Sequence, residues 1–183
     1  MTRIIGGSAR GRRLSVPPGR DIRPTAARIR EAMFGTLAAL TDLDGAAFLD
    51  LYAGTGAVGL EALSRGAARV VLVESDPAAA QVITGNVKAV DAAGAHLLRS
   101  RVEHVLRGRP EEFDIVFADP PYDVSDADLR ACIEVVVHAW TTPGAVLVVE
   151  RPTRGGEWAW PAGVEPIKAK RYGDGTLWYG RRS

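Results

Sequence analysis

One glycine-rich turn constrains the fold of this chain more than any other feature. An apolar run over residues 46–52 passes into residues 54–59, which have the spacing G-x-G-x-x-G. A helical pattern over 57–65 stops at Gly66, and a second apolar run covers 69–74. Glycines in such a turn let the backbone approach a ligand closely. Strand, glycine turn, helix and strand in this order predict a parallel βαβ unit of the kind that binds nucleotides.

The alternation of strands and helices continues along the chain. Asp76 and Pro77 predict the start of another helix, because aspartate caps helices and proline favours their first position. Further strands are indicated near 95–98, 113–118 and 145–150, and further helices at about 101–107 and 126–139. Residues 165–180 instead predict a hairpin that turns at residues 173–175. We therefore expect an α/β fold with a mostly parallel sheet, helices on both faces and an antiparallel C-terminal edge.

Positive charge is concentrated near the N-terminus. Residues 1–34 contain eight Arg against one Asp and one Glu, although the net charge of the whole chain is only +1. Short apolar segments at 3–5 and 13–16 flank a stretch rich in Gly and Arg, which predicts a small hairpin or a basic loop. Such a cluster suits phosphate contacts with little sequence readout. The candidate nucleic-acid-binding residues are Arg10, Arg12, Arg13, Arg20, Arg23 and Arg28.

A helix follows this basic arm. Thr25 can cap it, and apolar residues at helical spacing extend it to about Leu40. Arg28 and Arg30 lie away from the apolar stripe. The stretch from Arg23 to Arg30 either contacts nucleic acid or packs on the cofactor side, and the sequence leaves both open.

The totals exclude several classes of protein. With 183 residues, of which 46% are hydrophobic, the chain suits one core, so we expect a basic arm over 1–24 and a single domain over 25–183. The single Cys132 excludes an internal disulfide framework, and the three histidines lack the spacing of a metal site. No run approaches the roughly 18 apolar residues of a membrane span, and no secretion signal is evident. We expect a cytoplasmic protein without a metal.

Two acidic residues indicate which ligand the glycine turn binds. Glu74 closes the second apolar run, twenty residues after Gly54, where a carboxylate can accept hydrogen bonds from both ribose hydroxyls of an adenosine. Asp50 stands four residues before Gly54, where its charge disfavours a pyrophosphate. S-adenosylmethionine has no phosphate and carries an ammonium and a sulfonium, so it suits this turn better than a nicotinamide dinucleotide. A nicotinamide-dependent oxidoreductase remains an alternative, as does a turn that serves only helix packing.

A second motif follows the strand predicted at 113–118. It consists of Asp119, Pro120, Pro121 and Tyr122. The carboxyl end of a strand is where ligands bind in an open α/β sheet. Two prolines fix the backbone and remove two N–H donors, so carbonyl oxygens and the carboxylate form a rigid set of acceptors. The tyrosine adds an aromatic face on which a flipped base can stack.

These acceptors suit methylation of an exocyclic amine on a base. Holding the hydrogens of the –NH2 group favours the pyramidal, nucleophilic nitrogen that attacks a methyl group. Cys132 lies in the middle of a predicted helix, so cytosine-C5 methylation has no candidate nucleophile. Guanine presents two adjacent donors, N1–H and N2–H2, whereas adenine and cytosine place a ring acceptor beside the amine. An ionised Asp119 therefore fits guanine best, although backbone or water could serve the ring nitrogen of another base.

Further segments match a known family over nearly the full length of the chain. They are Arg3-Ile4-Ile5-Gly6-Gly7, Gly11-Arg12-Arg13-Leu14, Arg23-Pro24-Thr25, Arg28-Ile29-Arg30-Glu31, Phe34, residues 49–56, residues 59–66, residues 119–122, Arg171-Tyr172-Gly173 and Thr176. With these motifs the chain resembles the RsmD family of bacterial 16S ribosomal RNA guanine-N2 methyltransferases. The resemblance implies a Rossmann-like class I methyltransferase with a seven-stranded sheet, S-adenosylmethionine as methyl donor, and a guanine of 16S rRNA in an assembling small subunit as target.

The resemblance also extends the expected site. The residues expected around the cofactor are Asp50, Tyr52, Ala53, Gly54, Gly56, Glu74, Ser75, Arg101 and Val102. Ser100-Arg101-Val102 departs from the acidic or amide residue common after the third strand, which leaves open how the adenine is read. We expect a monomer that acts on 16S rRNA within small-subunit particles, where ribosomal proteins are further candidate partners.

The Asp-Pro-Pro-Tyr motif also occurs in DNA adenine-N6 methyltransferases. Adenine-N6 methylation of DNA or RNA therefore remains an alternative. Against DNA, only about the first 34 residues remain for target recognition once the catalytic sheet is subtracted.

Overall fold

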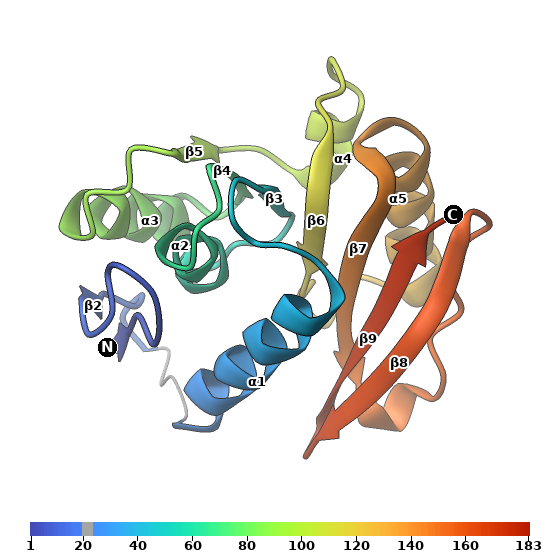
Figure 1. Cartoon of the computed structure of the whole chain (residues 1–183), viewed down its shortest axis with the longest axis horizontal. Coiled ribbons are helices and arrows are strands. Elements are labelled where there is room, and N and C mark those ends of the chain that lie inside the picture. The colour runs from blue at the N-terminus through green and yellow to red at the C-terminus, as the bar shows by residue number, and fades with distance from the viewer. Residues whose placement is uncertain (20–23) are drawn as a thin grey trace.

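A seven-stranded sheet forms the centre of the molecule in the computed structural model, which describes residues 1–19 and 24–183 (Figure 1). Its strands in chain order are β3 (Ala47–Asp50), β4 (Arg69–Val73), β5 (Ala95–Leu98), β6 (Phe113–Ala118), β7 (Thr141–Pro152), β8 (Val164–Tyr172) and β9 (Gly175–Arg182). The helices are α1 (Pro24–Leu40), α2 (Ala57–Ser64), α3 (Pro77–Ala89), α4 (Val102–Leu106) and α5 (Asp126–Ala139), with a 3-10 turn η1 (Thr153–Gly155). The predicted α/β fold is confirmed.

The order of strands across the sheet is β5-β4-β3-β6-β7-β9-β8. Strands β3 to β7 pair in parallel, while β9 pairs antiparallel with both β7 and β8. The predicted C-terminal hairpin thus forms the antiparallel edge. From β3 the chain winds outward to β5 and then returns to β6 on the other side of β3. Ligands bind where the winding reverses, beyond the carboxyl ends of β3 and β6.

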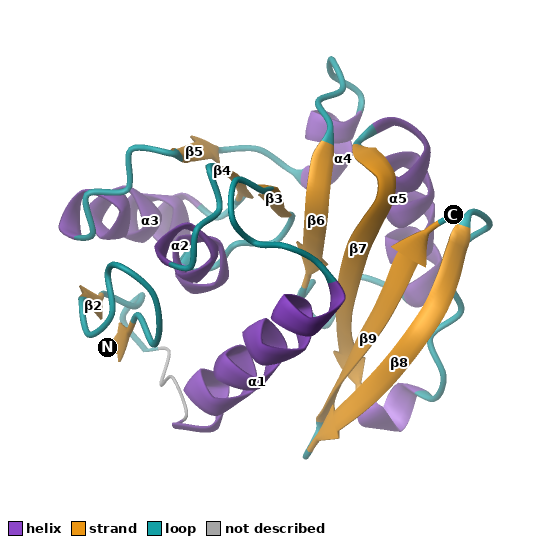
Figure 2. Cartoon of the chain, in the orientation of Figure 1, coloured by secondary structure: helices purple, strands orange, loops and turns teal. Residues whose placement is uncertain are grey.

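Helices cover both faces of the sheet (Figure 2). On one face α1, α2 and α3 pack against a buried cluster that includes Phe34, Phe48 and Phe117. On the other face α4 and α5 pack against a cluster that includes Val116 and Ile133. Successive residues of a central strand therefore enter different cores, which explains why these strands are continuous apolar runs rather than alternating ones.

Local capping chemistry sets several helix starts. The Oδ2 atom of Asp76 accepts a hydrogen bond from the Ala79 N–H at 2.8 Å, and Pro77 occupies the first helical position of α3, as predicted. Two boundaries differ from the prediction. Helix α1 begins at Pro24, so Thr25 lies inside the helix and is not its cap. Strand β7 extends beyond the predicted 145–150 because its pairing with both β6 and β9 continues past that range.

The predicted N-terminal hairpin is present and packs on the domain. Its strands, β1 (Thr2–Arg3) and β2 (Arg13–Leu14), pair antiparallel. The buried side chains of Ile4 and Leu14 contact Leu60 of α2. Asn86 of α3 accepts a hydrogen bond from the Ser15 N–H at 2.7 Å and donates to the Ser15 carbonyl at 3.0 Å. The basic residues therefore sit on a hairpin that is anchored to α2 and α3.

Within residues 1–19 and 24–183, no helix combines the length and the apolar character that a membrane span requires.

Candidate active site

Three carboxylates stand at the carboxyl ends of adjacent strands. Asp50 ends β3, Asp119 follows β6, and Glu150 lies near the end of β7. Strand β6 pairs in parallel with both neighbours, and its last residue, Ala118, is the partner of Val149. Asp119 and Glu150 are therefore the next neighbours across the two strands. The winding of the sheet thus brings the acidic groups together at the point where a ligand is expected.

These three carboxylates also project from the same face. Side chains of a strand alternate between the faces, so each carboxylate shares its face with the residue two positions before it. Those residues are Phe48, Phe117 and Val148, and all three belong to the cluster beneath α1. The acidic groups therefore face the side of the sheet that α1 covers.

Burial makes the negative charge of Asp50 costly. Its side chain is 1% exposed, Oδ1 has no hydrogen-bond partner among the described residues, and Oδ2 accepts a bond from the Gly59 N–H at 3.3 Å. The pKa of Asp50 is raised to about 7, mainly by desolvation; the bond from Gly59 opposes this shift and the nearby charge of Glu74 adds to it. A cation bound nearby would stabilise the ionised carboxylate.

The pKa values of Asp119 and Glu150 are raised as well. Desolvation is the main reason that the pKa of Asp119 lies well above its ordinary value, and the charges of Glu150 and Asp50 raise it further, while Arg151 lowers it. Asp119 is nevertheless exposed to solvent. Burial also raises the pKa of Glu150. This group of neighbouring carboxylates fits a ligand with an ammonium and a sulfonium, whose positive charges would favour the ionised carboxylates.

The glycine turn leaves space for such a ligand. Gly54 and Gly56 have positive φ angles of 58° and 78°, a backbone conformation that glycine adopts without strain. A Cβ atom built on Gly54 would meet no atom within 4 Å. The turn is fixed by the carboxylate of Glu74, which accepts a hydrogen bond from the Gly54 N–H at 2.8 Å and another from the Asp76 N–H at 2.8 Å. Each carboxylate oxygen keeps a lone pair that could accept a ribose hydroxyl.

Gly59 has a different function from the other two glycines. A Cβ atom there would lie 2.4 Å from Leu72 Cδ2 and 2.8 Å from Val70 Cγ1. Helix α2 packs so closely on β4 that only glycine fits. The motif therefore combines both readings of the sequence, since Gly54 borders open space, whereas a Cβ on Gly56 would already lie 3.4 Å from Ile83 Cγ1 and Gly59 serves packing.

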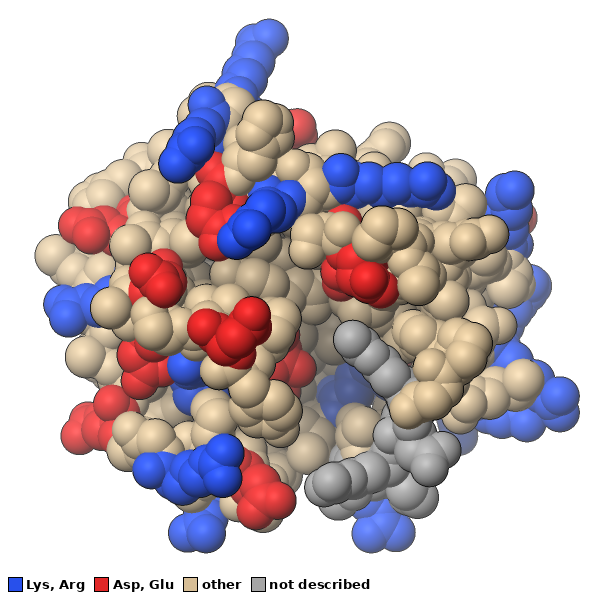
Figure 3. Space-filling model, turned by 180° about the vertical axis from the view of Figure 1, so that it is seen from behind, with Lys and Arg blue, Asp and Glu red and all other residues tan. Residues whose placement is uncertain are grey.

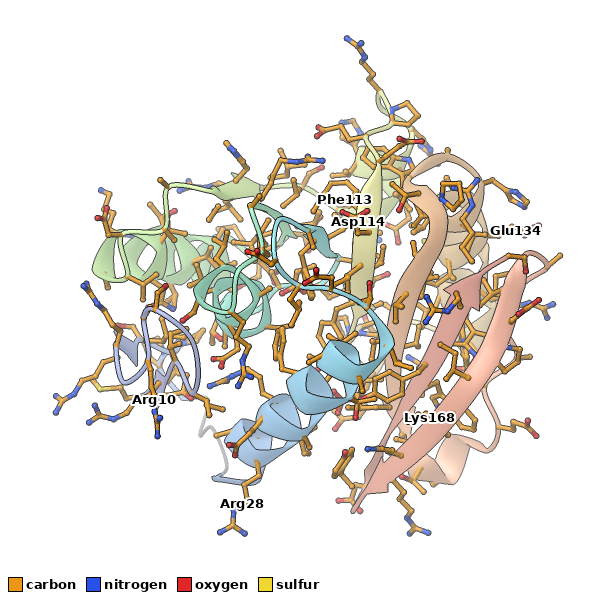
Figure 4. The ribbon with its side chains drawn as sticks, viewed as in Figure 1. Arg10, Arg28, Phe113, Asp114, Glu134 and Lys168 are labelled. Carbon is orange, nitrogen blue, oxygen red and sulfur yellow. The ribbon has the colours of Figure 1, made fainter. Side chains whose placement is uncertain are left out.

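The Asp-Pro-Pro-Tyr turn has a buried side, at Pro120, and a solvent-exposed side, at Tyr122. Pro120 is buried, whereas Tyr122 is 89% exposed. The Val124 N–H donates to the Pro121 carbonyl at 3.1 Å, and Arg151 donates to the Val124 carbonyl at 3.0 Å. The aromatic ring is thus presented to solvent on a fixed turn, as a stacking platform requires. Phe113 and Asp114 mark the opposite end of β6 (Figure 4).

The remaining predicted cofactor residues lie in neighbouring loops. The Ser100 N–H donates to the Glu74 carbonyl at 3.1 Å, which ties the loop after β5 to the end of β4. Arg101 is exposed, and its Nε lies 3.5 Å from Oε2 of Glu103. Val102 is buried at the start of α4. Tyr52 is half-buried, Ala53 is buried and Ser75 is exposed. The loops after β3, β4 and β5 are thus adjacent, and the ligand contacts of these residues stay a prediction.

The candidate nucleic-acid contacts divide into those on the surface and those outside the described residues. Arg10, Arg12, Arg13 and Arg28 are exposed, and Arg10 and Arg28 point away from the body of the molecule (Figure 4). Arg12 also donates to the Ala89 carbonyl at 3.2 Å. Seen from behind, many basic side chains project from the edge of the molecule, and acidic side chains are spread from its left edge to its middle (Figure 3). Arg20 and Arg23 lie outside the described residues.

Arg30 does not behave as predicted. The sequence places it away from the apolar stripe of α1, yet it is 6% exposed. Its Nε lies 3.6 Å from Oε2 of Glu61, and its guanidinium donates to the Arg3 carbonyl. Glu61 is fully buried in α2 and accepts hydrogen bonds from the N–H groups of Ile5 and Gly6 at 2.9 Å each. Arg30 and Glu61 therefore join the hairpin, α1 and α2.

Sequence reasoning missed Glu150. The signal that could have found it is a pattern shared by the central strands, each of which runs directly into an acid: Asp50, Glu74, Asp119 and Glu150. Cys132 is buried in α5, and burial raises the pKa of its thiol, so it is not an activated nucleophile. The described part of the chain contains no group of three or more His, Cys, Asp or Glu side chains that could hold a metal ion.

Sheet order, open glycine turn and clustered carboxylates define a class I methyltransferase that uses S-adenosylmethionine. A solved structure titled putative methyltransferase yhhF from Escherichia coli has a TM-score of 0.88, with 34% identity over 99% of this chain and 97% of that chain. The putative methylase HI0767 from Haemophilus influenzae has a TM-score of 0.80, with 26% identity over 98% and 97%. A magnesium protoporphyrin IX methyltransferase from Synechocystis with bound SAM, 16% identical, shares the fold with a TM-score of 0.71 over 89% of this chain and 82% of that chain.

Comparison with protein families and with curated relatives also identifies a methyltransferase. The model of the family described as Conserved hypothetical protein 95 matches residues 2–181. The ribosomal RNA small subunit methyltransferase D of Escherichia coli K12 is 37% identical over 159 residues, which cover 84% of this chain and 76% of that protein. The chain belongs to this family, the RsmD family of methyltransferases. The predicted family and cofactor are confirmed, and the nicotinamide alternative for the glycine turn is not supported.

Proposed function

We propose that this protein transfers a methyl group from S-adenosylmethionine to the exocyclic N2 amine of a guanine in 16S rRNA. The observation that carries the proposal is the rigid acceptor turn at residues 119–122, whose Asp119 lies close enough to Glu150 and Asp50 for their charges to raise its pKa. The relative in Escherichia coli is named for ribosomal RNA of the small subunit, which supports the class of substrate.

Guanine is favoured because its edge offers donors only. The amine N2–H2 and the ring N1–H lie side by side, and carboxylates and carbonyls accept from both. Adenine and cytosine would turn a ring nitrogen lone pair toward these acceptors. Adenine-N6 methylation therefore remains the second candidate, supported only by the occurrence of the same motif in such enzymes.

The chain's own groups position the amine and remove its proton. S-adenosylmethionine supplies an electrophilic methyl group, and its transfer leaves a neutral thioether. In our proposal the Asp119 carboxylate and the Pro120 carbonyl accept the two amine hydrogens, which favours the pyramidal nitrogen whose lone pair attacks the methyl carbon. When the N–C bond forms, the nitrogen loses one hydrogen as a proton. Asp119, whose pKa lies above its ordinary value, is a suitable acceptor for it.

The cofactor is proposed to lie across the ends of β3, β4 and β5. Asp50 and the backbone of the glycine turn would hold its methionine end, since a buried carboxylate with a free oxygen attracts an ammonium. Glu74 would accept the ribose hydroxyls. Ser75, Arg101 and Val102 would border the adenine.

The RNA is proposed to contact the anchored hairpin and the exposed aromatic ring. Arg10, Arg12, Arg13 and Arg28 would bind phosphates, which makes affinity depend on salt more than on sequence. Tyr122 would stack on the target base. We further propose that the protein acts as a monomer, in the cytoplasm, on assembling small-subunit particles. In this proposal residues 1–24 serve recognition and residues 25–183 catalysis.

Two measurements test the proposal. Undermethylated small subunits and naked rRNA are incubated with labelled S-adenosylmethionine, and the modified nucleotide is mapped by mass spectrometry. We expect N2-methylguanine in 16S rRNA, whereas N6-methyladenine would support the second candidate. In parallel, Asp119→Ala should lower the methylation rate by about 100-fold or more. It should also leave calorimetric binding of S-adenosylmethionine largely intact, and loss of binding by a folded variant would contradict the role given to Asp119.

A further inference from the structure

Glu150 stands beside Asp119 without a function in the scheme above. Ala118 and Val149 are paired across β6 and β7, so the next residue of each strand is Asp119 and Glu150. Both side chains project toward the face that α1 covers, and Glu150 alone is flanked by β9 on its other side. Glu150 therefore lies beside Asp119, on the side away from Asp50 and the glycine turn.

The surroundings of Glu150 leave its carboxylate free. It is half-buried, and within residues 1–19 and 24–183 it makes no hydrogen bond or ion pair. Its Oε1 lies 2.9 Å from the place where a Cβ of Gly175 would be, so the glycine in β9 provides the space it occupies. The neighbouring Arg151 does not pair with it, because that guanidinium lies 2.6 Å from Asp126. A half-buried carboxylate without a donor is unfavourable in the free protein.

A donor from the substrate would remove this cost. Under the proposed function, the two hydrogens of the target amine are taken by Asp119 and the Pro120 carbonyl, which leaves the ring N1–H of guanine without an acceptor. A buried donor without an acceptor would weaken binding. The carboxylate beside Asp119 is the group of the described chain that is placed to accept it.

We propose that Glu150 accepts the N1–H of the target guanine and so selects guanine over bases that carry a ring acceptor beside the amine. This inference rests on the proposed function and adds a second substrate-contacting carboxylate to it. Adenine would place a ring lone pair against the Glu150 oxygens, whereas guanine binding favours the ionised form of this carboxyl group. Selectivity thus comes from β7, while the amine is held by the turn after β6.

The test compares guanine with 2-aminopurine at the target nucleotide of a short RNA. Both bases carry an amine at C2, but N1 of 2-aminopurine is an acceptor without hydrogen. We expect Glu150→Gln to lower kcat/KM for the guanine RNA by about 10- to 100-fold, because a charge-assisted bond is lost. The glutamine amide can donate to N1 of 2-aminopurine, so kcat/KM for the 2-aminopurine RNA should rise. The ratio of guanine to 2-aminopurine methylation should therefore fall by a larger factor than kcat/KM for guanine does. 2-Aminopurine also lacks the O6 atom of guanine. This difference affects wild type and variant alike, so it cancels when their guanine to 2-aminopurine ratios are compared.

Controls separate this role from a structural one. Glu165→Gln changes an exposed glutamate of β8 and should leave the ratio unchanged. Glu150→Asp keeps the charge, so it should retain the preference for guanine at reduced rate. An unaltered ratio in a folded Glu150→Gln protein overturns the inference. If that variant does not fold, wild type must still prefer guanine over 2-aminopurine by at least about tenfold, and no preference refutes it. Failure of wild type to methylate guanine both in the short RNA and in undermethylated small subunits would instead refute the proposed function.

Discussion

Replacing Gly59 by alanine tests how closely α2 must approach the sheet. The added Cβ would lie 2.4 Å from Leu72 Cδ2 and 2.8 Å from Val70 Cγ1. Both neighbours are fully buried, so neither can turn into solvent. Overpacking of this kind costs about 1–3 kcal/mol, and the better helix propensity of alanine offsets about 0.5–1 kcal/mol of it. We expect a net loss of about 1–2 kcal/mol in the free energy of unfolding, or roughly 2–8 °C in Tm.

Gly35→Ala is the matched control for this measurement. Gly35 lies on the exposed side of α1, and a Cβ there would meet no atom within 4 Å. Urea unfolding of both variants isolates the steric clash, since the propensity gain is common to them, and we expect a difference of about 1–3 kcal/mol. Cofactor affinity should also fall in Gly59→Ala, because the Gly59 N–H holds Asp50. Equal stability of the two variants, within about 0.5 kcal/mol, would refute the argument from close packing.

Three other predictions address the acidic cluster, the stacking platform and the hairpin. The pKa of Asp50 is raised from 3.8 to about 7, so its ionisation should destabilise the cofactor-free protein as pH rises between these values. Asp50→Asn should flatten that part of a stability curve measured by urea unfolding, and parallel curves would contradict the assignment. Tyr122→Ala should weaken RNA binding in anisotropy titrations by about 1–3 kcal/mol without changing Tm, whereas Tyr122→Phe should bind normally. Glu61→Gln should destabilise the protein by about 3–5 kcal/mol and speed hydrogen exchange at Ile5 and Gly6. Unchanged exchange at those amides would show that Glu61 does not anchor the hairpin.

The elements that the sequence predicted well are those with local chemical signals. Asp76 and Pro77 specify the start of α3 by a hydrogen bond and a fixed φ that involve only neighbouring residues. The turn at residues 173–175 specifies the C-terminal hairpin in the same way. The Asp-Pro-Pro-Tyr turn was placed correctly because the apolar run before it ends abruptly. These features need no information about distant parts of the chain.

What the sequence did not predict depends on pairing between distant segments. Arg30 is buried because the hairpin and Glu61 pack on its side of α1. The helical pattern of α1 does not indicate either contact. Glu150 becomes part of the site only through the register of β6 and β7, which sets it beside Asp119. Periodicity reports the face of an element, but it does not report which element will cover that face.

The anchoring of the hairpin has a consequence for the order of events during synthesis. Residues 1–19 leave the ribosome first, yet the groups that hold them, Glu61, Ser64 and Asn86, are synthesised later. At translation rates of about 5–20 residues per second, the arginine-bearing segment is without its acceptors for on the order of 10 s. Completion of α3 then allows this segment to pack onto the finished domain, so the arginines pass from an unanchored peptide to a fixed surface.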